Sequence, residues 1–78
     1  MDDKTILSHI HELVEEEKQL RAAHHGLASE DRQRLQKLEL QLDQAWDLLR
    51  QRRARAETGE DPDSAAERSV NEVESYLQ

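Results

Sequence analysis

The stretch LQKLELQLDQAWDLLRQRRARA, residues 35–56, decides the fold of this chain. Its apolar residues recur at steps of three, four and seven, which places them on one stripe of an α-helix. Trp46 and Leu48 flank the stripe and widen it, and Arg52 fills its one missing step. The sequence therefore predicts a helix over residues 30–56, with Ser29 as its N-terminal capping residue. The residues of the stripe are Leu35, Leu38, Leu42, Ala45, Leu49 and Ala56.

A second apolar stripe of the same spacing occupies the N-terminal part of the chain. It predicts a helix over residues 3–25. Asp2 or Asp3 can cap its first turn, and Gly26 can adopt the left-handed conformation that closes its last turn. This stripe consists of Ile6, Ile10, Leu13 and Leu20, with Leu7 and Val14 beside it.

The link between the two predicted helices is short, so the helices must lie antiparallel, as a coiled-coil-like hairpin. Matching the two stripes places opposite each other those residues whose numbers sum to about 55. The pairs Asp3–Arg52 and His24–Asp31 would then close the two ends of the apolar seam with opposite charges. The remaining layers pair Ile6 with Leu49, Ile10 with Ala45, Leu13 with Leu42, Glu17 with Leu38, and Leu20 with Leu35.

The C-terminal part predicts a turn and then a weak helix. Residues 58–64, TGEDPDS, contain a glycine and the single proline of the chain. Residues 65–77 have helical spacing, with Ser64 and Glu67 at capping-box distance. So short a helix is marginal alone in water, so it either docks on the hairpin through Tyr76 and Leu77 or frays. The prediction is one all-α domain, residues 1–78: a two-helix hairpin with a short C-terminal helix or ordered tail.

The apolar surface of this hairpin is wider than a two-helix seam needs, because Leu7, Val14, Trp46 and Leu48 flank the two stripes. A chain of this size has little core to offset the entropy lost on folding. The extra surface should be covered by the C-terminal segment, by a second copy of the chain, or by both. We predict a homodimer that pairs two hairpins into a four-helix bundle, since isologous pairing is the commonest arrangement of soluble oligomers.

The chain is acidic, with a formal net charge of −7, and its positive charge gathers at Arg50, Arg52, Arg53 and Arg55. Such a cluster could bind nucleic acid or an anionic ligand. An acidic tail follows at once, however, and no aromatic residues are interleaved to stack on bases. We therefore expect the arginines to pair with acidic residues of the same chain, and nucleic-acid binding is the weaker alternative.

Metal-binding and catalytic patterns are weak in this sequence. HELVE at residues 11–15 departs from the His-Glu-x-x-His zinc motif, so His11 and Glu15 could hold a metal only weakly. Glu17 and His24 fall on the inner stripe, but no Glu lies three residues before a His, as di-metal bundles require. The chain has no Cys, no glycine-rich phosphate loop and no nucleophile elbow. We expect no metal, no cofactor and no catalytic residue, hence a protein that is not an enzyme, and four surface histidines.

Four segments together resemble a small actinobacterial family of unknown function: LDQAWDLLRQRRAR at 42–55, GEDPD at 59–63, VESYLQ at 73–78 and IHELVEEE at 10–17. The run WDLLRQRR is the most specific part. The resemblance implies a cytoplasmic protein of about this length, with no assigned activity and no catalytic residues to transfer. A cytoplasmic location also agrees with the lack of a membrane-spanning stretch or a signal-peptide pattern, so we expect no membrane contact.

The sequence thus favours a small protein–protein interaction or self-association module. The alternative is a regulator that binds nucleic acid or an anionic ligand through the arginine cluster. The candidate interaction surface consists of Leu7, Val14, Trp46, Leu48, Arg50, Arg52, Arg53, Arg55 and Tyr76.

Overall fold

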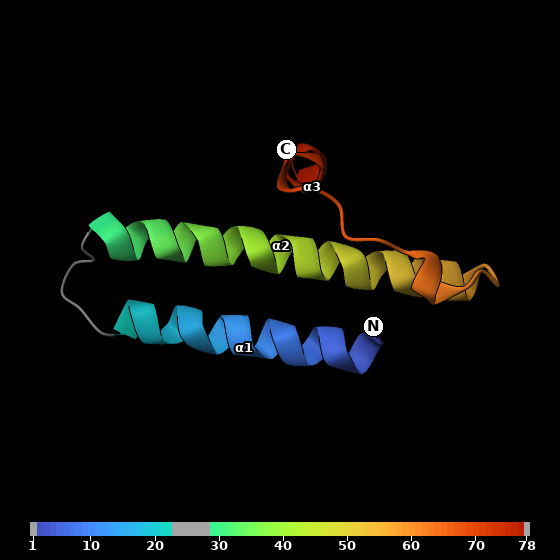
Figure 1. The fold of residues 1–78 in the computed structure, drawn as a ribbon, viewed down its shortest axis with the longest axis horizontal. Helices are drawn as coiled ribbons and strands as arrows, with labels where there is room; N and C mark the ends of the chain where they lie inside the picture. Colours follow the sequence, from blue (N-terminus) through green and yellow to red (C-terminus); the bar gives the residue numbers. More distant parts are fainter. Residues whose placement is uncertain (1, 23–28, 78) are drawn as a thin grey trace.

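The structure, a computed structural model, describes residues 2–22 and 29–77, with side chains up to residue 75. Its elements follow in the order α1 (Asp3–Ala22), α2 (Ser29–Glu57), the 3-10 turn η1 (Pro62–Ser64) and α3 (Val70–Leu77). α1 and α2 lie side by side, and the chain runs in opposite directions along them (Figure 1). The described residues contain no strand, so the predicted all-α hairpin is confirmed.

The ends of the two long helices differ a little from those predicted. α1 is described to Ala22, and its predicted end at Gly26 lies outside the described residues. α2 already includes Ser29 as its first residue and continues to Glu57. At the start of α1, the Asp2 side chain accepts a hydrogen bond of 2.8 Å from the backbone N–H of Thr5. This bond caps the helix. Hydrogen bonding from the side chain and from the backbone N–H of Thr5 lowers the pKa of Asp2, because it favours the carboxylate.

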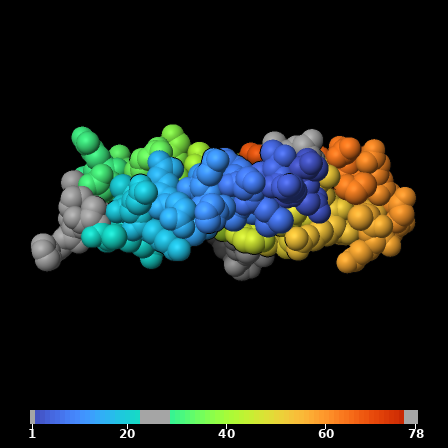
Figure 2. Space-filling model, turned by 90° about the horizontal axis from the view of Figure 1, so that it is seen from below, coloured from blue at the N-terminus to red at the C-terminus, as the bar shows by residue number. Residues whose placement is uncertain are grey.

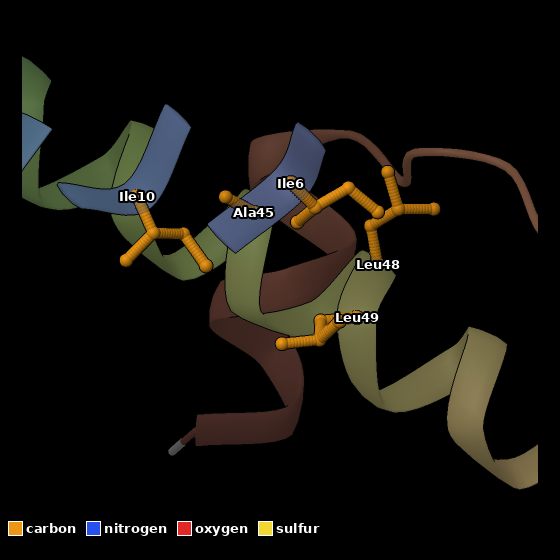
Figure 3. Close-up of a cluster of buried hydrophobic side chains, with 5 residues drawn as sticks. All are labelled: Ile6, Ile10, Ala45, Leu48 and Leu49. Carbon is orange, nitrogen blue, oxygen red and sulfur yellow. The ribbon is translucent and has the colours of Figure 1, made fainter. Parts of the chain in front are cut away.

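The core extends along the seam to Leu13 and Leu38, which are also buried, and is concentrated at the open end of the hairpin. Ile6, Ile10, Ala45, Leu48 and Leu49 form one buried cluster there (Figure 3). Two of the predicted layers, Ile6 with Leu49 and Ile10 with Ala45, therefore fall in the same cluster. The register at this end is fixed by Arg52, whose Nε donates to Asp3 Oδ1 over 2.7 Å. This is the predicted Asp3–Arg52 pair, whereas His24 of the opposite pair lies outside the described residues.

Ion pairs flank the apolar seam on both edges. On one edge, Arg21 Nη2 lies 2.9 Å from Glu39 Oε1. On the other edge, Arg34 pairs with Glu16. All four side chains are largely exposed, so the pairs help to fix the register more than they add to stability.

α2 ends in a Schellman motif built around Gly59. The N–H of Glu60 donates to the carbonyl of Arg55 over 2.8 Å, and the N–H of Gly59 donates to the carbonyl of Ala56 over 3.3 Å. Gly59 has a φ of 80°, in the left-handed region. The motif turns the chain back, so that η1 packs on the end of α2 (Figure 2), where Arg52 binds both Asp63 of η1 and Asp3 of α1.

Replacing this glycine should be costly through its backbone alone. A Cβ at Gly59 would meet nothing within 4 Å, so the expected loss of about 1–2 kcal/mol in the free energy of unfolding for Gly59→Ala comes from the left-handed conformation. Urea denaturation measures this loss. Gly59→Asn is the control and should cost less, because Asn adopts this conformation more readily. Equal losses for Ala and Asn would contradict the conformational explanation.

The C-terminal helix begins later than predicted, at Val70 instead of residue 65. Its N-terminal cap is Ser69, since the N–H of Glu72 donates to Ser69 Oγ over 3.2 Å and the Ser69 hydroxyl donates to Glu72 Oε1 over 3.4 Å. The predicted box of Ser64 and Glu67 is wrong, because Ser64 belongs to η1 and its hydroxyl donates to the carbonyl of Asp61. The same Ser-x-x-Glu spacing occurs twice within nine residues, and only the second instance opens a helix.

α3 docks on α2 and crosses it steeply, because Figure 1 shows α3 end-on while α2 lies in the plane of the view. Val73 is its anchor and is only 1% exposed. The extended residues before α3 are held by two α2 side chains one heptad apart: Gln44 donates to the carbonyl of Arg68 and Gln51 to that of Ala66. The side chains of Tyr76 and Leu77, through which docking was predicted, lie outside the described residues.

Candidate functional site

Arg52 has a structural role, because its guanidinium is paired with two carboxylates of the same chain. The residue is 8% exposed, and its guanidinium binds Asp3 through Nε at 2.7 Å and Asp63 through Nη1 at 2.8 Å. These hydrogen bonds raise the pKa of Arg52, and the same contact lowers the pKa of Asp63. One side chain thus ties the start of α1 and η1 to α2.

The other three arginines of the cluster separate into two kinds. Arg55 is half-buried, and its Nη1 donates to Glu60 over 3.3 Å and to Ser64 Oγ over 3.0 Å, so it also holds the turn. Arg50 and Arg53 are exposed and make no ion pair with the described residues. The four arginines therefore do not form one basic surface, since two face inward to the turn and two face solvent.

The apolar residues predicted for the interaction surface differ in how far the structure buries them. Leu48 is 8% exposed and lies in the core cluster, so its assignment to a contact surface is wrong. Val14 is half-buried. Leu7 and Trp46 are the exposed large apolar side chains of the described residues, at 40% each. Tyr76, the remaining aromatic residue, has a side chain outside the described ones.

Leu7 and Trp46 belong to the same edge of the hairpin. The Arg21–Glu39 ion pair shows which side of α1 meets which side of α2. Leu7 and Val14 precede Arg21 by whole heptads, and Trp46 follows Glu39 by one heptad, so all of them continue along that edge. We call the surface of Leu7, Val14, Leu42 and Trp46, with Arg50 and Arg53 at its rim, the Trp46 face.

The Trp46 face lies away from the docked C-terminal segment. Trp46 is two residues from Gln44, which is a rotation of about 200° around the helix axis. Gln44 and Gln51 hold the C-terminal segment on their side of α2. The C-terminal segment was expected to help cover the wide apolar surface. It covers the side of α2 that carries Leu48 and leaves the side that carries Trp46 exposed.

The described residues also line two shallow hollows. One, of about 290 Å³, lies beside the end of α2 and is lined by Gln51, Arg55 and Glu60 among others. The other, of about 260 Å³, lies between His9, Leu48 and Glu67. Both are smaller than the roughly 300–1,000 Å³ pockets that enclose drug-sized ligands. Within residues 2–22 and 29–77 no three His, Asp or Glu side chains are placed to hold a metal ion, and no helix could span a membrane.

A pair of carboxyls lies where α3 meets α2. A hydrogen bond with Asp43, burial and repulsion by Asp43 together raise the pKa of Glu74 above its ordinary value. Glu74 Oε1 is buried and meets no hydrogen-bond donor among the described residues. The neighbouring Asp47 is compensated by Arg68, whose Nε lies 3.6 Å away. These groups could not be predicted from the sequence, because isolated carboxylates on a helix carry no periodic signal.

We expect this carboxyl pair to make the docking of α3 depend on pH. Because the pKa of Glu74 is raised in the folded chain, its contribution to stability is complete below the ordinary value of 4.5 and is lost as pH rises through the raised value. Glu74→Gln should remove this dependence and strengthen the docking of α3 at neutral pH. Hydrogen exchange of the α3 amides at pH 5 and pH 7 measures how strongly α3 docks at each pH. An unchanged pH dependence in Glu74→Gln would contradict the assignment.

Comparisons with known proteins agree with the resemblance seen in the sequence. Residues 2–78 match the family described as "Protein of unknown function (DUF2630)". The chain is 52% identical over 77 residues to uncharacterized protein Rv0898c of Mycobacterium tuberculosis and equally to uncharacterized protein Mb0922c of Mycobacterium bovis, covering 95% of this chain and 88% of each relative. No solved structure matches the chain. The expected small actinobacterial family is thereby confirmed, and the chain belongs to the DUF2630 family of proteins of unknown function.

Proposed function

We propose that this protein is a cytoplasmic protein–protein interaction module without enzymatic activity, and that its contact surface is the Trp46 face. The observation that carries the proposal is the exposure of Trp46 and Leu7, 40% each, on one edge of the hairpin. Trp and Arg are the residue types that most often dominate protein interfaces, and Arg50 and Arg53 border Trp46 here. A face of this composition gains most when another protein covers it.

The alternative of a nucleic-acid or anion-binding regulator has less support. It needs a continuous basic surface, whereas Arg52 and Arg55 already bind Asp3, Asp63 and Glu60. The two remaining arginines stand on a chain with a net charge of −7, which repels polyanions at long range. Retention on heparin that falls steeply with salt would favour this alternative over the proposed one.

Site-specific photo-crosslinking in cells tests the proposed surface even when the partner is unidentified. A benzoylphenylalanine side chain is placed at Leu7 or at Trp46, and at Glu12 as the control. Glu12 is exposed and points away from α2. We expect one discrete adduct from residues 7 and 46 and none from residue 12. Equal or absent adducts at all three positions would refute the proposal, and the mass of a discrete adduct identifies its partner class.

Trp46→Ala separates a contact surface from a structural role. Because Trp46 is 40% exposed, the loss in free energy of unfolding should stay below the roughly 3–5 kcal/mol typical of a buried Trp. The adduct from position 7 should nevertheless disappear, because the centre of the contact surface is gone. Urea denaturation of dilute protein and crosslinking measure the two effects. A loss in the range of a buried Trp, with the adduct retained, would assign Trp46 to the core.

A further inference from the structure

We infer that the partner on the Trp46 face is a second copy of this chain, with the two α2 helices antiparallel and crossing at Trp46. This inference rests on the proposed function, because it names the partner of the same face. It is carried by the order of charges along α2 and by which of those charges the fold leaves unmatched.

On the side of α2 that carries Trp46, the charged residues before Trp46 in the sequence are acidic and those after it are basic. Asp43 lies three residues before it and Glu39 seven before, whereas Arg50 lies four after it and Arg53 seven after. These steps keep all four on the side of the helix that carries Trp46. A two-fold axis through Trp46 reverses the direction of the second helix. Each acidic residue then faces an arginine of the other copy, Glu39 against Arg53 and Asp43 against Arg50.

A parallel arrangement of the same two helices is disfavoured by the same charges. It would place each arginine beside its own equivalent and each carboxylate beside its own equivalent, at four positions on each helix. Like charges directly opposed at an interface cost affinity and select against that arrangement. The surface is therefore self-complementary in one direction only, which is the property that an isologous contact requires.

The fold leaves the two arginines without an acidic partner among the described residues and the two carboxylates partly exposed. Arg50 and Arg53 are exposed and have no acidic partner among the described residues. Glu39 accepts a bond from Arg21, but its side chain is 49% exposed and a carboxylate can accept further hydrogen bonds. Asp43 is half-buried beside Glu74, whose Oε1 meets no hydrogen-bond donor among the described residues. A guanidinium from the second copy would bring positive charge to this pair of carboxyls.

The apolar part of the surface fits the same occupant. Trp46 would pack on its equivalent at the axis, with Leu7 and Val14 beside it. Burying these side chains adds apolar contact area to a chain in which eight of the described apolar residues are buried. Two hairpins would then meet through α2, giving a four-helix assembly. Gln44 and Gln51 hold the segment before α3 on the outer side, while Glu74 of α3 borders the contact beside Asp43.

Disulfide trapping tests the geometry, because the chain contains no Cys of its own. Asp43→Cys and Arg50→Cys are purified separately, then oxidised alone and as an equal mixture. An antiparallel crossing at Trp46 brings residue 43 of one copy near residue 50 of the other, so the mixture should give several-fold more disulfide-linked dimer than either variant alone. Predominant self-linking of either variant would overturn the inference, since a parallel pair aligns identical positions.

Sedimentation of the full chain provides the second measurement. The wild type should dimerise in the micromolar range, and Arg50→Glu with Arg53→Glu should weaken the dimer at least about tenfold, because it turns four attractive contacts into repulsive ones. Circular dichroism checks that the doubly substituted chain stays helical. A monomeric wild type, together with a discrete adduct of another mass from position 7, overturns this inference and leaves the proposed function intact. The absence of any adduct at positions 7 and 46 defeats both.

Discussion

Leu49→Ala is expected to lower the free energy of unfolding by about 2–5 kcal/mol. Leu49 is 1% exposed and packs in the cluster with Ile6, Ile10, Ala45 and Leu48. Removing its branched end takes apolar contacts from both helices and leaves a cavity that the seam can close only partly. For a chain of 78 residues the whole stability is about 4–12 kcal/mol, so this single change removes a large share.

Urea denaturation of dilute protein, followed by circular dichroism, measures the effect of Leu49→Ala. Leu7→Ala is the matched control, because it deletes the same atoms from a side chain that is already 40% exposed. Leu7→Ala should lower the free energy of unfolding clearly less than Leu49→Ala does. Similar losses for the two variants would show that the seam does not pass through Leu49 as described.

The second large expected effect concerns the ion pairs of Arg52. We expect the fold to lose more stability when Asp3 and Asp63 are removed than when Arg52 is removed. Asp3 and Asp63 keep 46% and 69% of their side chains exposed, whereas the Arg52 side chain is 9% exposed. Arg52→Met therefore leaves two carboxylates that water can solvate. Asp3→Ala with Asp63→Ala leaves a guanidinium that is buried without a partner, which is the more costly defect.

Thermal unfolding of the two variants at neutral pH tests this order, with Arg53→Met as the control for losing an exposed charge. The melting temperature should fall most in the double alanine variant, less in Arg52→Met and little in Arg53→Met. The pKa of Asp63 is lowered in the folded chain. The wild type should therefore lose this contribution as pH falls through the lowered value, and the double alanine variant should not. A larger loss in Arg52→Met would contradict the burial argument.

The hairpin and its register could be predicted from the sequence because they depend on apolar spacing, loop length and the placement of opposite charges. The sum of residue numbers across the seam predicted the pair Asp3–Arg52, which is 49 residues apart in the chain. The C-terminal segment could not be predicted in the same way. It is held by Gln44 and Gln51, which bind backbone carbonyls, and such polar anchors leave no apolar period to detect.

The candidate surface was predicted only in part, for a related reason. Trp46 and Leu48 both flank the main stripe, and spacing alone cannot tell which of them the C-terminal segment will cover. The segment docks on the side of Gln44 and Gln51, so Leu48 becomes buried and Trp46 stays exposed. The arginines separated similarly. The stripe predicted that Arg52 meets Asp3, but only the position of the turn decides that Arg52 also binds Asp63 and that Arg55 binds Glu60.

Trp46 is the single tryptophan of the chain, so its fluorescence reports the environment of the proposed contact surface directly. The most direct test follows its emission maximum and its quenching by acrylamide over a dilution series, beside sedimentation of the same samples. If a second copy covers Trp46, the emission shifts to longer wavelength and quenching increases as the dimer dissociates on dilution. Emission and quenching that stay constant while the dimer dissociates would contradict the proposed contact, because Trp46 would then lie outside it.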